Sequence, residues 1–244
     1  MSFIIEISAI LFLSIFQSVF GVGLLLFGTP LFLYFGYGFS ETLSALLPAS
    51  IAISFTQFFF STNKDLNYIK DFNFFCLPFL GIFLYLIVFY EKTIDFKYWI
   101  SIILIISSIT TINSNKFYSL SDAIFKSRKL VLMFIGIIHG VSNMGGSFLS
   151  IFSSSMSKNN KLLTRQYISY GYLSMGIIQY LILAIFYTSN LSFNKFFYIF
   201  LAIIVYFPSQ SIFNFVIYNI YVKVISIVAM IFGMSILISH YISF

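Results

Sequence analysis

Long runs without a charged side chain dominate this sequence. Cutting it at every Asp, Glu, Lys and Arg leaves eight long charge-free windows: 7–40, 42–63, 72–90, 98–115, 130–157, 166–194, 196–222 and 224–244. A helix needs about 20 apolar residues to cross the hydrocarbon core of a bilayer, and every window is near or above that length. The windows are continuously apolar, without period-two alternation, so they predict eight membrane-spanning helices and not the strands of a β-barrel.

Composition leads to the same fold class. Of the 244 residues, 60% are hydrophobic and only 8% are charged, whereas soluble domains carry about 25% charged residues. We therefore expect an all-α integral membrane protein, with residues 1–244 forming a single transmembrane domain in a lipid bilayer. The net charge of +6 comes from basic residues at window edges, where lipid headgroups account for them, so we expect no nucleic-acid partner.

Cysteine and histidine usage argues against a metal centre. Cys76 is the single cysteine, which excludes an internal disulfide, and no cluster of His, Cys and carboxylates has metal-ligand spacing. We expect neither a metal nor a cofactor.

Membrane orientation is only weakly encoded. Eight spans would place both termini on one side, with seven Lys and Arg residues there against six on the other. The cluster of Lys126, Arg128 and Lys129 favours cytoplasmic termini in a multi-pass protein of the cytoplasmic membrane.

The window starts indicate an internal duplication. Starts at 7, 42, 72 and 98 are followed by starts at 130, 166, 196 and 224, at offsets of 123, 124, 124 and 126. This predicts two homologous four-helix repeats, residues 1–115 and 130–244, joined by a connecting loop over 116–129. Four spans per half make the repeats parallel, whereas a re-entrant piece in the long first windows would make them inverted, and the sequence leaves both open.

Glycines gather in two stretches, 21–38 and 136–146, which hold nine of the thirteen in the chain. A glycine break at bilayer depth frees backbone N–H groups that protein or a watery cavity must satisfy. Such broken helices often face a central substrate site, and free N–H groups suit an anion. We therefore expect the first helix of each repeat to be broken and the breaks to form one midplane anion site; close helix packing is the alternative. The predicted substrate-binding residues in the breaks are Gly21, Gly23, Ser142, Asn143, Gly145, Gly146 and Ser147.

Other polar residues extend this predicted site. Arg165, 124 residues after Glu41, is a candidate anion clamp, or else an interfacial arginine. Glu41 is a candidate partner of Arg165 or carrier of a coupling proton, or else a carboxylate at a helix N-terminus. His139 either relays protons or is a neutral, hydrogen-bonded side chain. The remaining candidates line a path or hydrogen-bond between helices; they are Gln17, Gln57 and Gln179.

The stretch QSVFGVGLLLFGTPLFL, with Gly21, Gly23 and Pro30, resembles the first repeat of the TauE/SafE (sulfite exporter, toluenesulfonate uptake permease) family. The second half agrees through its four glycines, the KNNK loop at 158–161 and Arg165. Leu24, Leu25 and Ser147 depart from the glycines and proline frequent in that family. The resemblance implies transport of small anions, often sulfur oxyanions or organosulfonates, across the cytoplasmic membrane.

Enzyme motifs are missing from the sequence. It contains no Gly-x-Ser-x-Gly, no His-Glu-x-x-His and no phosphate-binding loop. We therefore expect a protein that is not an enzyme but a secondary transporter of a small anion, a sulfonate or sulfite-like species, working by alternating access. The candidate coupling ions are a proton and sodium. The alternatives are a passive channel for small anions or solutes and a membrane scaffold subunit.

Overall fold

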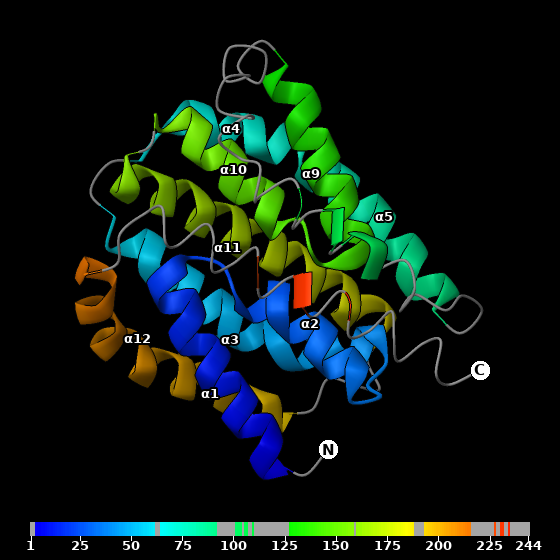
Figure 1. The fold of residues 1–244 in the computed structure, drawn as a ribbon. Coiled ribbons are helices and arrows are strands. Elements are labelled where there is room, and N and C mark those ends of the chain that lie inside the picture. The colour runs from blue at the N-terminus through cyan, green and yellow to red at the C-terminus, as the bar shows by residue number, and fades with distance from the viewer. Residues whose placement is uncertain are drawn as a thin grey trace.

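A computed structural model describes residues 3–61, 64–91, 127–158, 160–187 and 193–215, together with 101–103, 105–106, 109, 227, 230–231 and 234. Every regular element in these described parts is a helix, as Figure 1 shows. The elements are α1 (Phe3–Phe20), α2 (Leu24–Tyr34), α3 (Phe39–Phe59), α4 (Leu66–Phe75), α5 (Leu77–Tyr90), α9 (Arg128–Ser142), α10 (Gly146–Met156), α11 (Lys161–Phe186), the 3-10 turn η2 (Phe193–Phe196) and α12 (Phe197–Phe215).

Four helical segments in the described residues are long and apolar enough to cross a membrane. They are Phe3–Phe20, Phe39–Phe59, Leu66–Tyr90 and Lys161–Phe186. Large apolar side chains stand exposed on the outside, among them Phe12, Ile185 and Phe200, each 65–68% exposed. A surface of this kind suits lipid and not water, so the coarse expectation of an all-helical membrane protein is confirmed.

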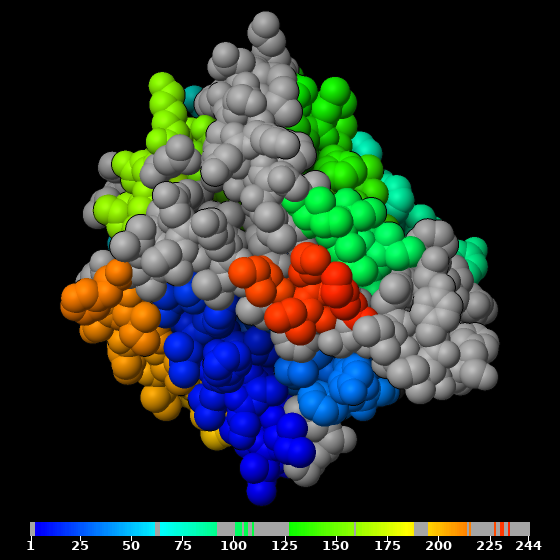
Figure 2. Space-filling view, viewed as in Figure 1, coloured from blue at the N-terminus to red at the C-terminus, as the bar shows by residue number. Residues whose placement is uncertain are grey.

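The helices pack around a central pair. α3 and α11 lie along each other in the middle, α1 packs against α12, and α5 packs against α9. Figure 2 shows α1 and α12 side by side on one face of the molecule. The first helix of each half therefore packs on the last described helix of the other half.

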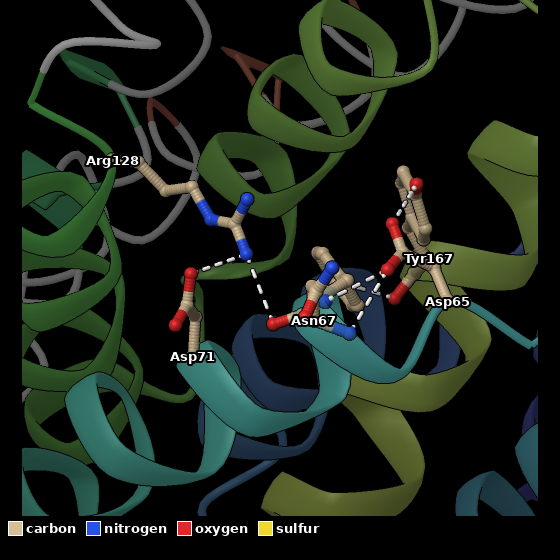
Figure 3. Close-up of polar contacts among 6 residues, drawn as sticks. Asp65, Asn67, Asp71, Arg128 and Tyr167 are labelled. Atoms are coloured by element: carbon tan, nitrogen blue, oxygen red, sulfur yellow. Dashed lines mark hydrogen bonds and ion pairs between the residues drawn. The ribbon is translucent and has the colours of Figure 1, made fainter.

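One end of the bundle, which we call the basic end, gathers most of the described cations. They are Lys64, Lys70, Arg128, Lys129, Lys158, Lys161 and Arg165, accompanied by Asp65 and Asp71. Polar contacts tie its elements together (Figure 3): Arg128 pairs with Asp71 and donates to the Asn67 carbonyl at 2.9 Å, and the Tyr167 hydroxyl donates to Asp65 at 2.8 Å. Burial works to raise the pKa of Asp65, but the Tyr167 hydroxyl and two backbone N–H groups at the start of α4 outweigh it and lower that pKa.

The opposite end, which we call the acidic end, holds Glu6, Glu41 and Glu91. Tyr37 and Tyr198 donate to the Glu6 carboxylate at 3.1 and 2.8 Å, and the Ser40 backbone N–H donates to Glu91 at 3.0 Å. Burial, followed by the Glu6 charge, raises the pKa of Tyr37 to about 12. Among the described residues, the cation at this end is Lys195 in η2, which donates to Ser44 at 2.7 Å.

Two helix pairs return to the end of the bundle at which they begin. α1 starts at the acidic end, and Tyr37, which follows α2, returns to Glu6. α9 starts at the basic end, and Ser157, which follows α10, meets Thr164 at the start of α11. α2 and α10 have 11 residues each, or about 16 Å of helix, too short for a hydrocarbon core of about 30 Å.

The predicted windows located the helices better than they located the crossings. Windows 7–40 and 130–157 each hold two helices instead of one span. The helix of the third predicted window, 72–90, begins earlier, at Leu66, because the charged Lys70 and Asp71 at the bundle end do not end it. Pro78 separates α4 from α5 near Cys76. The predicted spans over 98–115 and 224–244, and most of the connecting loop, lie almost entirely outside the described residues.

Candidate functional site

The first predicted break lies between α1 and α2. Gly21 and Gly23 have φ angles of 76° and 153°, which disfavour L side chains. A Cβ on Gly23 would lie 3.0 Å from Phe16 Cδ1 and 3.1 Å from the Gln17 nitrogen. The chain can therefore turn here only because both positions are glycine.

Two glutamines hydrogen-bond the backbone at this break. The Leu24 N–H at the start of α2 donates to Gln17 Oε1 at 3.2 Å, while Gln57 Nε2 donates to the carbonyls of Gln17 and Ser18 at 3.1 Å each. Gln17 is anchored in turn by donating to the hydroxyls of Ser50 and Ser54 at 3.1 and 3.0 Å. Side chains thus replace the water that lipid cannot supply.

The second predicted break lies between α9 and α10. Asn143 ends α9 in the left-handed region, with φ 61°. Its amide donates to the Thr29 hydroxyl of α2 at 2.7 Å, and Gln179 Nε2 of α11 donates to Asn143 Oδ1 at 3.1 Å. Ser142, Asn143 and Ser147 are all buried, so protein groups hold this break on several sides.

Close packing explains the four glycines of the second stretch. A Cβ on Gly136 would lie 2.3 Å from the Cys76 carbonyl oxygen, and one on Gly140 would lie 2.8 Å from that of Leu80. One on Gly145 would meet His139 Cβ at 2.7 Å, and one on Gly146 would meet Tyr172 Oη at 1.6 Å. For these residues the packing alternative accounts for glycine, as small residues commonly do where membrane helices meet.

A pocket of about 570 Å³ opens at the basic end beside the first break. Its polar lining comes from α3, α11 and α12 and includes Gln57, Asn160, Arg165, Gln166 and Gln210. Arg165 is the charged residue among the lining side chains, and the apolar wall includes Phe60, Leu162 and Phe207. The lining therefore offers one cation, several amides and an apolar surface.

Arg165 is held in place by α12. Its Nη2 donates to Gln210 Oε1 at 2.6 Å and to the Tyr206 hydroxyl at 3.3 Å, and its guanidinium carbon lies 4.2 Å from the centre of the Phe213 ring. Its Cγ lies 4.0 Å from where a Cβ on Gly21 would be. Arg165 thus joins the pocket to the first break.

The residues of the second break do not line this pocket. Gln57, which holds the first break, lies 18 residues into α3 from the acidic end, counting from Phe39. Gln179, which holds the second, lies 18 residues into α11 from the basic end, counting from Lys161. At 1.5 Å per residue each distance is about 27 Å, so the breaks lie toward opposite ends and do not share one midplane cavity in this structure.

Glu41 lies at a helix N-terminus, the second of its predicted alternatives, and does not pair with Arg165. Glu41 is in the first turn of α3 at the acidic end, 16 residues or about 24 Å of helix before Gln57, which shares the pocket with Arg165. Its charge acts instead on Lys195, whose pKa is lowered by burial against the opposing influence of Glu41 and Glu6.

His139 is fully buried in α9, its ring edge-on to Tyr172 with 5.9 Å between ring centres. Neither imidazole nitrogen has a well-formed hydrogen bond within the described residues. The imidazole lies within interaction range of Gln179, which connects it to the second break.

A buried polar stripe runs along α3, and the sequence analysis found only its last member. Its spacing of three or four residues places it on one helical face, apart from an apolar turn around Leu47. The stripe consists of Ser40, Ser44, Ser50, Ser54 and Gln57, none more than 5% exposed. The 17 residues from Ser40 to Gln57 cover about 26 Å, close to the thickness of the hydrocarbon core.

Several functional candidates were not found from the sequence. Gln166 lies next to Arg165, which is a stronger sequence signal than a single amide, and Gln210 and the serines of α3 are unremarkable individually. The three-to-four-residue spacing of those serines was the signal that could have revealed the stripe. No family model, curated protein or solved structure matches the chain.

Proposed function

We propose that this protein is a secondary transporter of a small organic anion of the sulfonate or sulfite-like class. The observation that carries the proposal is the Arg165 pocket standing at one end of the buried polar stripe on α3. A guanidinium offers five N–H donors in a planar fork, which matches an oxyanion. The lining residues that the structure describes include no carboxylate, and the apolar wall suits an organic tail on the anion.

The position of the pocket adds to its preference for anions. Asn160 is the N-cap of α11 and, with Leu162 and Leu163, lines the pocket. The positive end of the α11 dipole therefore points at the same space as Arg165. The charge of Arg165 and the dipole of α11 therefore both favour binding of an anion.

The closed interior supports a gated transporter over an open channel. Ser50 and Ser54 are 1% and 0% exposed, so the described part of the stripe admits no continuous water column. Transport would require the helices around it to move, as in alternating access.

We further propose that the halves are inverted repeats. α1 begins at the acidic end and α9 at the basic end, and the pairing of α1 with α12 is matched by that of α9 with α5. The N-caps Gly23 and Gly145 lie 122 residues apart, as do Gly38 and Asn160. Gln57 and Gln179 share this offset, which is two residues shorter than the window starts suggested.

An inverted pair gives a simple account of alternating access. In this structure the pocket at the first break is open toward the basic end. The corresponding space at Gly146 is filled by the Tyr172 hydroxyl. If the two halves exchanged conformations, the pocket at the first break would close and the space at Gly146 would open toward the acidic end.

Charge also supports an orientation. The described cations concentrate at the basic end, so the positive-inside rule favours a cytoplasmic basic end. The amino-terminal residues of α1 would then face the opposite side of the membrane. This differs from the cytoplasmic termini expected from sequence, because that count assumed that every window crosses once.

The proposal is tested by uptake of radiolabelled sulfonates and sulfite into proteoliposomes. We expect saturable uptake by the wild-type protein and at least about tenfold slower uptake by Arg165→Gln, since a charge-assisted hydrogen bond contributes about 1.5–3 kcal/mol. Arg165→Lys should retain part of the activity. Lys158→Gln removes an exposed cation at the same end and serves as the matched control.

Three results would count against this function. Flux that rises linearly without saturation would favour a channel, and absence of flux for every anion would favour a scaffold. Wild-type uptake by a folded Arg165→Gln protein would remove Arg165 from the site.

A further inference from the structure

A second pocket, of about 580 Å³, lies at the basic end between α4 and α9. It shares no lining residue with the Arg165 pocket. Its lining includes Lys70, Asp71, Phe74, Phe75, Arg128 and Lys129. Among the described residues, three cations and one carboxylate therefore line this space.

Arg128 is fixed before any ligand arrives. It pairs with Asp71 and donates from the same nitrogen to the Asn67 carbonyl at 2.9 Å (Figure 3). Within the described residues its buried Nε–H has no acceptor. Asp71 balances one cation, so Lys70 and Lys129 leave the described lining residues with a net charge of +2.

The apolar residues around this pocket continue along the membrane-facing helices. Phe74 follows Lys70 by one turn of α4, and Leu130 and Phe134 lie one turn apart on the exposed face of α9, turned away from Arg128; these three side chains are 66%, 67% and 47% exposed. Lys129 also lies over the Phe75 ring, with its nitrogen 5.0 Å from the ring centre. A ligand with an anionic head and long apolar tails would match both parts of this surface.

We propose that this pocket binds the headgroup of an anionic phospholipid. The phosphate sits among Lys70, Arg128 and Lys129, and the acyl chains lie along Phe74, Leu130 and Phe134. Basic pockets between helices at the cytoplasmic membrane surface hold anionic headgroups in this way. A free phosphate would engage the cations alone and leave the apolar residues unused.

Lipid titration followed by native mass spectrometry tests the proposal on the full-length protein in neutral detergent, without transport substrate. Phosphatidylglycerol should bind more tightly than phosphatidylcholine. Lys70→Gln/Lys129→Gln should weaken phosphatidylglycerol binding at least about tenfold, since each basic residue near the surface contributes about 1 kcal/mol. Lys64→Gln/Lys158→Gln removes two exposed cations at the same end, outside the pocket, and should change binding less than about twofold.

Three outcomes would overturn the assignment: equal losses in the two double variants, equal binding of both lipids, or inorganic phosphate raising the Tm as much as phosphatidylglycerol does. Arg165→Gln separates this proposal from the transport function. It should keep lipid binding while losing uptake, so failure of either claim leaves the other standing.

Discussion

At the residue scale, glycine has two different roles in this protein. Gly21 and Gly23 supply backbone angles that other residues rarely adopt, whereas Gly136, Gly140 and Gly146 make room for neighbouring atoms. The sequence shows both glycine stretches, 21–38 and 136–146, but does not distinguish the two roles. The difference depends on what stands opposite each glycine, such as the Tyr172 hydroxyl, and this partner is set by tertiary packing.

Gly146→Ala tests the packing role. The added methyl would overlap the Tyr172 hydroxyl, so we expect a lower Tm in detergent, corresponding to about 1–3 kcal/mol of overpacking. Tyr172→Phe in the same chain should recover part of the loss, because it removes the nearest atom. The matched control is Ser147→Ala at the adjacent buried position. An unchanged Tm in Gly146→Ala would show that Tyr172 does not fill this space.

At the element scale, the account depends on how broken helices are stabilised inside a membrane. Gln57 on α3 and Gln179 on α11 each hold one break, at positions 122 residues apart. The sequence identified both glutamines as path-lining or helix-linking candidates. In the structure both hydrogen-bond between helices, and Gln57 also lines the Arg165 pocket. It could not predict these partners, because carbonyls freed by a break become acceptors only once the helices have docked.

Gln57→Leu should destabilise the protein by about 1–3 kcal/mol, because the Ser18 carbonyl loses its side-chain donor in a buried site, whereas the Gln17 carbonyl keeps the Gly21 N–H. Gln179→Leu should act similarly through Asn143. Thr56→Val is the control, since the Thr56 hydroxyl bonds only within its own helix, to the Ala52 carbonyl at 2.7 Å. Thermal unfolding in detergent measures all three. Equal effects of Gln57→Leu and Thr56→Val would argue that Gln57 does not support the break.

At the scale of the whole molecule, helix number and direction were the hardest features to obtain from sequence. Hydropathy finds apolar windows, but a hairpin of two short helices and one straight span have the same composition. Counting windows 7–40 and 130–157 as single crossings put Lys64 and Lys158 on opposite sides of the membrane. In the structure both lie at the basic end. The two ends of the bundle therefore differ in their number of described Lys and Arg residues, whereas the count from the sequence was nearly equal on the two sides.

Cysteine labelling tests this arrangement in a Cys76→Ala background. Lys64→Cys and Lys158→Cys should react with a membrane-impermeant maleimide from the same, cytoplasmic side, because both native residues are exposed at the basic end. Phe35→Cys, at an exposed position near the acidic end, should react from the other side. Labelling of Lys64→Cys and Lys158→Cys from opposite sides would restore the simple eight-span topology.

The central claim is that the Arg165 pocket binds a small organic anion, and calorimetric titration of the purified protein tests it most directly. We expect an alkylsulfonate to bind the wild-type protein and the Lys158→Gln control with equal Kd, and to bind Arg165→Gln at least about tenfold more weakly. An uncharged sulfone of the same size should not bind. Equal affinity of the wild-type and Arg165→Gln proteins for the sulfonate, or equal binding of the sulfone, would contradict the account.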